Sequence, residues 1–322
     1  MPVGRVRSPP KIAHRYFAAR KRSYAPITSN RSVFSGNFIG TLKRLSVART
    51  AMPFISVRDI QIYYEISGKG SHLLYISGTG ADLRNKPNVF DSPLADQFEI
   101  LAFDQRGLGQ TERPDIRYSM ADYADDAAGL IKALDWGRCH VVGISFGGMV
   151  AQELALRHAE CIDRMVLCCT SSGGAGGHSY PFHEMPDLPE DEMNSISVAI
   201  NDSRHDAAWQ QQNPERYQAI LARNNARNAG ADEPGRETGA RRQLEARIDH
   251  DTFDRLPRLK LPVFIAGGAY DGVAPPANLE AINRQIEQSK IQFFQGGHDF
   301  YDHDPLAFQR IAEFLQGKLD DR

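Results

Sequence analysis

The stretch that decides the fold is Cys139–Gln152, which reads C-H-V-V-G-I-S-F-G-G-M-V-A-Q. An apolar run ends in Gly-x-Ser-x-Gly, and a helical pattern of small residues follows it. This order predicts a strand, a sharp turn and a helix, with Ser145 at the turn. Gly143 and Gly147 leave room where a side chain would crowd the turn. We therefore expect Ser145 to project beyond the end of a strand, where a serine can act as a nucleophile.

The motif alone is also compatible with an ordinary turn, because the chain contains 27 glycines. Its surroundings favour the functional interpretation. Short apolar runs alternate with helical patterns on both sides of Ser145. This alternation is typical of a mostly parallel sheet that helices cover on both faces. In such a sheet ligands bind beyond the carboxyl ends of the strands, where the loops at Ser77, Asp104 and Ser145 all fall.

The apolar runs and helical patterns can be assigned to particular residues. Further strands are predicted as a pair within Phe54–Ile66 and then at His72–Ile76, Phe98–Phe103, Ile162–Cys169, Pro262–Ala266 and Ile291–Phe294. Helices are predicted between the Ser77 loop and Gln97, and at Ala121–Leu134, Gly147–His158, Leu279–Glu287 and Pro305–Leu315. Ser119 is the expected N-cap of the helix that begins near Ala121.

Between the two halves of this pattern lies a segment without convincing strands. Its helical patterns are Glu190–Asn201, Asp206–Gln211, Pro214–Asn228 and Arg236–Ile248. We predict a helical cap over residues 171–255, packed on a core formed by residues 52–170 and 256–322. Trp209 and Tyr217 are expected to face the site. The arginines of the cap are interpreted as solvated helix faces, although one of them could instead hold a substrate carboxylate.

The N-terminal segment differs in charge from the rest of the chain. Residues 1–50 hold 11 of the 38 Lys and Arg, and the first of the 40 acidic residues is Asp59. Residues 51–322 therefore carry a net charge of about −13. We predict that residues 1–51 form a disordered extension outside the folded core. This segment is interpreted either as sequence upstream of a natural start at Met52 or as an organelle transit peptide. A nucleic-acid-binding tail is not favoured, because residues 51–322 are acidic.

Two later residues are candidate partners for Ser145. A serine hydroxyl needs a base within hydrogen-bond reach, usually His, and the imidazole needs a carboxylate to orient it. Asp271 follows one predicted strand, and His298 follows the next behind two glycines. The order Ser, Asp, His fits strands that carry the three residues to one edge of the sheet. Asp271 could also be only a turn residue, because a proline-rich segment follows it.

A tetrahedral intermediate also needs hydrogen-bond donors for its oxyanion. The backbone N–H of Phe146, at the start of the helix after the turn, is the first candidate. The second is the N–H of Thr79 in the loop Ser77–Gly80, which could otherwise be a plain flexible turn. Asp104 and Arg106 are interpreted as architectural residues that bond neighbouring loops.

Together these motifs resemble the α/β-hydrolase superfamily over about residues 54–170 and 256–318. The resemblance rests on Gly143-Ile144-Ser145-Phe146-Gly147-Gly148, Asp104-Gln105-Arg106-Gly107-Leu108-Gly109, Asp271 with Val273 and Pro275, and Gly297-His298. It implies an eight-stranded, mostly parallel sheet and hydrolysis by acyl transfer without a metal or an organic cofactor. Within the superfamily the chain is most similar to the branch of 3-oxoadipate enol-lactonase, cofactor-free haloperoxidase and aminoacrylate hydrolase. One departure is Ser77-Gly78, where the family frequently has His-Gly.

These observations predict a serine hydrolase that cleaves a small carboxylic ester or lactone through an acyl-enzyme on Ser145. The alternatives are a cofactor-free haloperoxidase or perhydrolase, a carbon–carbon bond hydrolase, or a ligand-binding protein that does not turn over its ligand. A dehalogenase is disfavoured because its nucleophile would be Asp. The sequence leaves the substrate and the oligomeric state open.

The composition argues against several other classes of protein. No stretch approaches the roughly 18 apolar residues of a membrane span. The four cysteines lack metal-ligand spacing, and we expect them to be reduced. No metal, cofactor or nucleic-acid partner is therefore predicted. The expected location is cytoplasmic, or an organelle if residues 1–51 are a transit peptide.

Overall fold

The computed structural model describes residues 53–185 and 188–319. The predicted extension over residues 1–51 lies outside the described residues. Within them, no helix is both long and apolar enough to cross a membrane.

A sheet of eight strands, in the order β1-β2-β4-β3-β5-β6-β7-β8, forms the centre of the described chain. The strands are β1 Phe54–Val57, β2 Ile60–Gly68, β3 Ser71–Ile76, β4 Phe98–Phe103, β5 Cys139–Ile144, β6 Ile162–Cys168, β7 Val263–Gly268 and β8 Ser289–Phe294. β1 and β2 are antiparallel, β2 is antiparallel to β4, and the remaining neighbours are parallel. This confirms the predicted eight-stranded, mostly parallel sheet.

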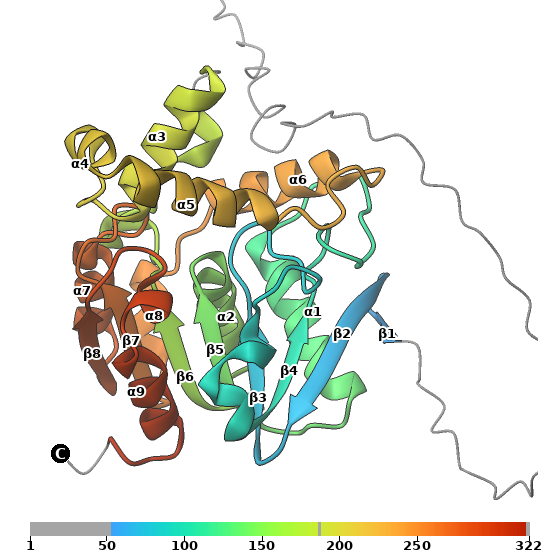
Figure 1. Ribbon diagram of the computed structural model, residues 1–322. Coiled ribbons are helices and arrows are strands. Elements are labelled where there is room, and N and C mark those ends of the chain that lie inside the picture. Colours follow the sequence, from blue (N-terminus) through green and yellow to red (C-terminus); the bar gives the residue numbers. More distant parts are fainter. Residues whose placement is uncertain (1–52, 186–187, 320–322) are drawn as a thin grey trace, which may run out of the picture.

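Helices cover both faces of this sheet (Figure 1). One face carries α1 Met120–Ala133, α2 Phe146–Arg157 and α7 Pro276–Gln285, and the other carries α8 Phe300–His303 and α9 Leu306–Leu315. Successive strand residues point to opposite faces: in β3, Leu74 packs toward α1 and α2, whereas Leu73 packs on the opposite side. Because both faces are buried, the strands read as continuous apolar runs, which is why they could be predicted.

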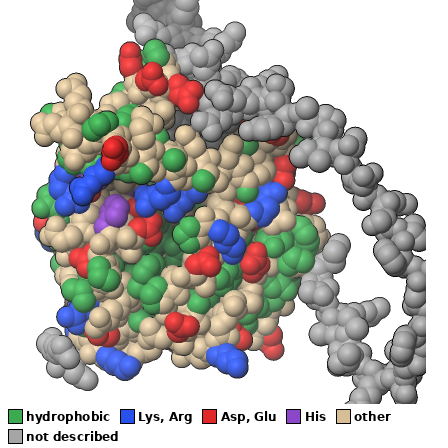
Figure 2. Space-filling view, in the orientation of Figure 1, with side chains coloured by type: hydrophobic (Ala, Val, Ile, Leu, Met, Phe, Trp, Pro, Cys, Tyr) green, Lys and Arg blue, Asp and Glu red, His purple; other side chains and the backbone are tan. Residues whose placement is uncertain are grey.

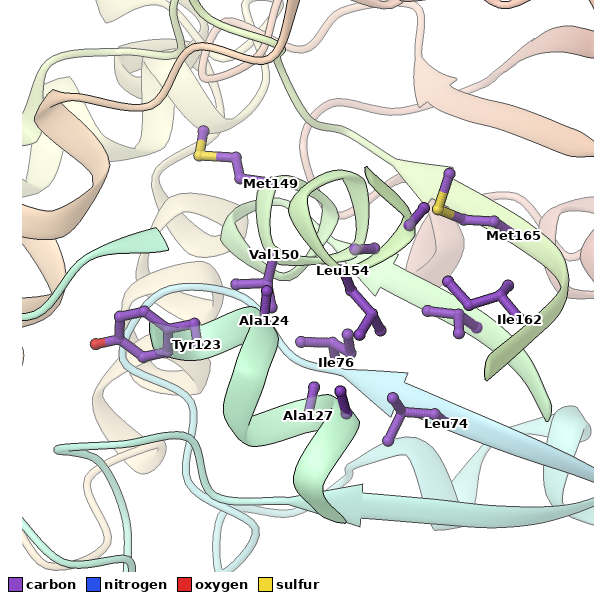
Figure 3. Close-up of a cluster of buried hydrophobic side chains, with 14 of the residues drawn as sticks. Leu74, Ile76, Tyr123, Ala124, Ala127, Met149, Val150, Leu154, Ile162 and Met165 are labelled. Atoms are coloured by element: carbon purple, nitrogen blue, oxygen red, sulfur yellow. The ribbon is translucent and has the colours of Figure 1, made fainter. Parts of the chain in front are cut away.

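The core beneath α1 and α2 fixes the helix that follows Ser145. Figure 3 shows Leu74 and Ile76 of β3 beneath Val150 and Leu154 of α2, with Ala127 of α1 beside them. These side chains are fully buried or nearly so. Burying an aliphatic side chain of this size contributes about 1.5–3 kcal/mol to folding, so the position of α2 is set by the core rather than by the site.

One predicted helix is wrong. Between the Ser77 loop and β4, the structure has only two short 3₁₀ helices, Val89–Asp91 and Pro93–Asp96. Pro87 and Pro93 lack the N–H that an α-helix interior requires and exclude the preceding residue from helical geometry. Helical composition alone therefore misled the prediction in this segment.

Within the described residues, the α-helices of the connection between β6 and β7 are α3 Glu190–Asn201, α4 Ala207–Gln212, α5 Pro214–Ala226 and α6 Arg236–Ile248. We call α3–α6 the helical insertion. The predicted bounds of α3 and α6 agree with the structure, and those of α4 and α5 differ by one or two residues. In Figure 1 the insertion lies over the carboxyl ends of the parallel strands. The division of the chain into a core and a cap stays a prediction.

The boundary between the helical insertion and the rest of the molecule is rich in charge. Figure 2 shows Lys and Arg side chains next to Asp and Glu side chains along this boundary. Arg223 lies 3.7 Å from both Asp299 and Asp302, and Arg227 lies 3.7 Å from Asp302. Arg236 makes a closer pair with Asp82, at 3.0 Å. The partly exposed pairs of Arg223 and Arg227 each contribute about 0–1 kcal/mol, so they orient the insertion more than they stabilise it.

Candidate active site

Ser145 lies at a sharp turn between β5 and α2, as its sequence context predicted. Its φ of 54° and ψ of −114° are unusual for a residue with a side chain, and such a conformation costs on the order of 1–3 kcal/mol. The neighbouring glycines make the turn possible. A Cβ at Gly147 would lie 2.0 Å from the carbonyl oxygen of Ile76, and one at Gly143 would lie 2.4 Å from that of Gly147. The strained serine is therefore held by close packing on both sides.

The structure brings Ser145, His298 and Asp271 into contact. His298 Nε2 lies 2.9 Å from Ser145 Oγ, and His298 Nδ1 lies 2.8 Å from Asp271 Oδ2. Asp271 follows β7 and His298 follows β8. The Asp271 side chain is 1% exposed and the His298 side chain is 14% exposed. Three segments far apart in sequence thus form one hydrogen-bonded chain at the edge of the sheet.

The Asp271 carboxylate is held so that only one oxygen faces the imidazole. Its Oδ1 accepts hydrogen bonds from the backbone N–H groups of Val273 (2.7 Å) and Ala274 (2.9 Å). Because an ionised carboxylate can only accept, the proton of a neutral His298 lies on Nδ1. Nε2 is then left as an acceptor for the hydroxyl of Ser145, which is the tautomer that a general base needs.

Two opposing effects act on the pKa of His298. Burial lowers it, but the negative charge and the hydrogen bond of Asp271 raise it, with a further contribution from the charge of Asp299. Arg247 acts in the opposite direction. The net result is a pKa raised above the ordinary 6.5, so the site stabilises an imidazolium ion.

The loop Ser77–Gly80 lies beside the serine. A Cβ at Gly78 would be 3.5 Å from the Cβ of Ser145, and Thr79 follows it as a half-buried residue. On the other side, Phe146 begins α2, where backbone N–H groups lack intrahelical partners. The roles of Thr79 and Phe146 as oxyanion donors stay predictions.

Comparison with known proteins agrees with this fold. Residues 71–197 match the model of a family described as alpha/beta hydrolase fold. The enol-lactonase of Burkholderia xenovorans LB400 has a similar structure, with a TM-score of 0.63 at 22% sequence identity; the match covers 83% of this chain and 98% of that one. The chain thus has the α/β-hydrolase fold, and residues 71–197 match the model of that family.

Curated relatives match this chain over part of their length. An uncharacterized protein of Mycobacterium tuberculosis is 32% identical over 154 residues, which cover 48% of this chain and 43% of that protein. The 2-hydroxymuconate semialdehyde hydrolase of Pseudomonas sp. (strain CF600) is 36% identical over 121 residues, covering 37% of this chain and 41% of the enzyme. The chain thus spans less than half the length of these relatives.

Asp104 and Arg106 form hydrogen bonds and ion pairs with neighbouring loops. The Asp104 carboxylate accepts hydrogen bonds from the backbone N–H groups of Leu83 and Gln110, both at 2.8 Å. Burial outweighs these bonds and raises the pKa of Asp104 to about 7. The Arg106 guanidinium lies 2.7 Å from Asp126 and is also paired with Asp59. These contacts support the turn after β4 and agree with the architectural role inferred from the sequence.

Residues of the helical insertion also reach the site, and the sequence did not single them out. The carbonyl oxygen of Ile200 accepts from Gly272 N (2.9 Å), and that of Asn201 accepts from His298 N (2.6 Å). The end of α3 therefore joins the two loops that carry Asp271 and His298. These contacts use backbone carbonyls, which any residue type would provide, so no residue type in the sequence could indicate them.

The expectation of solvated arginines in the insertion needs correction at Arg247. This side chain is 9% exposed, and its guanidinium donates to Ser179 Oγ (3.1 Å) and to the carbonyl oxygen of Tyr180 (2.6 Å). Trp209 packs on His205 within the insertion, with ring centroids 4.0 Å apart; that Trp209 and Tyr217 face the site stays a prediction. Gln243 contacts the Ser77–Gly80 loop: its Oε1 accepts from Gly80 N at 2.9 Å.

A separate cavity of about 430 Å³ lies near β1 and the α5–α6 connection. Its lining includes Glu233, which forms ion pairs with Arg84 and with Arg113. None of Ser145, Asp271 and His298 lines it. The cavity is therefore separate from the Ser145 site.

Proposed function

We propose that the protein is a serine hydrolase that cleaves a small carboxylic ester or lactone through an acyl-enzyme on Ser145. The observation that carries the proposal is the hydrogen-bonded chain from Ser145 Oγ through His298 to Asp271, at 2.9 and 2.8 Å. A serine, a base and an orienting carboxylate in this order are the groups that acyl transfer requires.

In the acylation step, Ser145 Oγ bonds to the carbonyl carbon while His298 Nε2 takes the hydroxyl proton. The π electrons of the carbonyl move onto its oxygen and form a tetrahedral oxyanion. When that electron pair returns, the bond to the leaving oxygen breaks, and His298 donates its proton to the departing alkoxide. The alcohol, or the open hydroxyl of a lactone, is the first product.

In the deacylation step, water repeats these events. His298 takes a proton from the water molecule, and the hydroxide oxygen bonds to the acyl carbon. Collapse of the second oxyanion breaks the bond to Ser145 Oγ, which regains the proton from His298. The carboxylic acid leaves and the serine is restored. All proton transfers use His298, and these steps require no cofactor.

Asp271 acts by orienting His298 and by stabilising the imidazolium ion that each step creates. We assign the oxyanion donors to the N–H groups of Phe146 and Thr79. A preorganised donor of this kind is worth roughly 3–4 kcal/mol of transition-state stabilisation. Support comes from the position of the Thr79 loop beside Ser145 and from the unpaired N–H groups expected at the start of α2.

We further propose that residues 171–255 act as a cap that shapes the pocket for the substrate. The helical insertion contributes Gln243 to the loop beside Ser145 and the carbonyls of Ile200 and Asn201 to the loops of Asp271 and His298. The polar composition of this segment favours a small ester or lactone over a long-chain lipid.

The first test uses a fluorophosphonate, which phosphonylates an activated serine, and p-nitrophenyl acetate as the ester. We expect labelling of the folded wild-type protein and loss of labelling in Ser145→Ala, together with a fall in esterase kcat by at least about a thousandfold. Ser172→Ala is the matched control, because the hydroxyl of this buried serine reaches only the adjacent carbonyl of Gly173. An undiminished esterase rate in Ser145→Ala would refute the proposal.

A second candidate, carbon–carbon bond hydrolysis with the same residues, is favoured by the 36% identity to 2-hydroxymuconate semialdehyde hydrolase. The two functions differ in the bond that breaks after attack on the carbonyl. Parallel assays with 2-hydroxymuconate semialdehyde and with a panel of small esters and lactones would separate them. A kcat/KM at least about a hundredfold higher for the semialdehyde would favour carbon–carbon hydrolysis.

A further inference from the structure

The loop Ser77–Gly80 is held near its two ends by two glutamines. Gln105 Nε2 donates to the carbonyl oxygen of Ser77 at 2.8 Å, and Gln243 Oε1 accepts from Gly80 N at 2.9 Å. Gln105 belongs to the turn after β4, whereas Gln243 belongs to α6 of the helical insertion. Thr79, the proposed oxyanion donor, lies between the two attachment points. The loop is therefore held by the turn after β4 near one end and by the helical insertion near the other.

The face of α6 that carries Gln243 lies directly on the site. Gly239, Gln243 and Arg247 are four residues apart and so share one face of the helix. A Cβ at Gly239 would lie 1.8 Å from the carbonyl oxygen of Gly107, which shows how closely α6 approaches the turn after β4. Arg247 lies near enough to influence the pKa of His298. Gln243, between them, is 0% exposed.

The orientation of the Gln243 amide follows from its bond to Gly80. A backbone N–H can be satisfied only by an acceptor, so the oxygen faces Gly80 and the amino group lies on the other side. That amino group is buried and has no hydrogen-bond partner among the described residues. A buried unpaired donor is destabilising. The unpaired amino group thus offsets part of what the bond to Gly80 contributes to stability; an apolar residue would remove that donor but would also leave the N–H of Gly80 without this acceptor.

From these observations we propose that Gln243 is a positioning residue for catalysis, rather than a stabilising residue. Its Oε1 fixes Gly80 and so sets the direction of the neighbouring Thr79 N–H toward the oxyanion. It thereby makes the geometry of the oxyanion loop depend on the position of α6. This inference rests on the proposed function, since it requires that an oxyanion forms on the Ser145 adduct.

The test is Gln243→Met, which keeps the length of the side chain and removes the acceptor. With p-nitrophenyl acetate we expect kcat to fall about 10–100-fold while KM changes less than about threefold, because the loop acts on the transition state more than on the bound ester. Affinity for phenyl trifluoromethyl ketone, which forms a tetrahedral oxyanion adduct on serine, should fall by a similar factor. The midpoint of the acid limb of kcat/KM should not move, because His298 and Asp271 are untouched.

Gln210→Met is the matched control. Gln210 is a buried glutamine of the same insertion, 8% exposed, and its amide is fully used within the insertion. Its Oε1 accepts from Ser195 Oγ, and its Nε2 donates to the carbonyl oxygens of Ser195 and His205. We expect Gln210→Met to lower the Tm by several degrees with kcat unchanged. Gln243→Met should show the reverse, a fall in kcat with a smaller change in Tm.

The outcomes are distinguishable. A wild-type kcat and ketone affinity in folded Gln243→Met would overturn the inference, and so would parallel losses of kcat and Tm in both variants. If Gln243→Met fails to fold, Gln243→Leu provides the same comparison, because it also lacks the acceptor. Absence of turnover and of fluorophosphonate labelling in the wild-type protein would instead refute the proposed function itself.

Discussion

Ser145 combines an unfavourable backbone conformation with a hydrogen bond to His298. The positive φ of 54° persists because the glycines around it let α2 and β3 approach closely. An isolated chain would relax from this conformation, so the folded core supplies the free energy that maintains it. The packing of α2 therefore directs the hydroxyl of one residue toward its base.

At the same scale, the pKa of His298 predicts the pH dependence of the reaction. A general base must be neutral, and a pKa raised above 6.5 keeps the imidazole protonated to a higher pH. The rate should therefore fall as the pH drops, with a midpoint of kcat/KM above 6.5. Asp271→Asn removes the charge that raises the pKa, so we expect the midpoint to move to lower pH and kcat to fall about 10³–10⁴-fold.

The control for this experiment is Asp304→Asn, because the Asp304 carboxylate accepts from the backbone N–H groups of Gln295 and Leu306 rather than from His298. It should leave both the midpoint and kcat near the wild-type values. A midpoint that stays in place in Asp271→Asn would show that Asp271 does not control the protonation of His298.

At the scale of elements, the junction of β3, β5 and α2 is tightly packed. The carbonyl oxygen of Ile76 occupies the place that a side chain at Gly147 would need. The neighbouring atoms belong to the backbone, which cannot rotate away as a side chain could. Any change that pushes α2 outward would also move Ser145.

This junction predicts a contrast between two Gly→Ala substitutions. Gly147→Ala should lower the free energy of unfolding by at least about 3 kcal/mol and abolish esterase activity, because its Cβ would lie 2.0 Å from Ile76 O. Gly137→Ala meets no atom within 4 Å, but its φ is 64°, so we expect a loss of only about 1 kcal/mol from backbone strain. Urea denaturation and p-nitrophenyl acetate turnover would measure both effects. Similar stabilities for the two variants would contradict the assigned packing.

At the scale of the whole molecule, the features that could be predicted from the sequence are those that depend on local patterns of residues. Continuous apolar runs predicted the strands, and the loops that follow these strands predicted that Ser145, Asp271 and His298 lie at one edge of the sheet. The contacts of the helical insertion could not be predicted in this way. Gln243 and Arg247 look like ordinary polar residues of a helix, and their burial depends on where α6 packs. The 3₁₀ segment before β4 was wrongly predicted as a helix. Most of its residues are compatible with an α-helix, but its prolines interrupt one.

The central claim also concerns the whole molecule, because the proposed reaction needs residues from three segments that lie far apart in the sequence. Acetyl transfer from p-nitrophenyl acetate, followed by rapid acid quenching and peptide mass spectrometry, would test it most directly. We predict one acetyl group on the peptide that contains Ser145, formed in the burst phase and absent from Ser145→Ala. An acetyl group on another residue, or turnover by the wild-type protein without an acyl-enzyme on Ser145, would contradict the account.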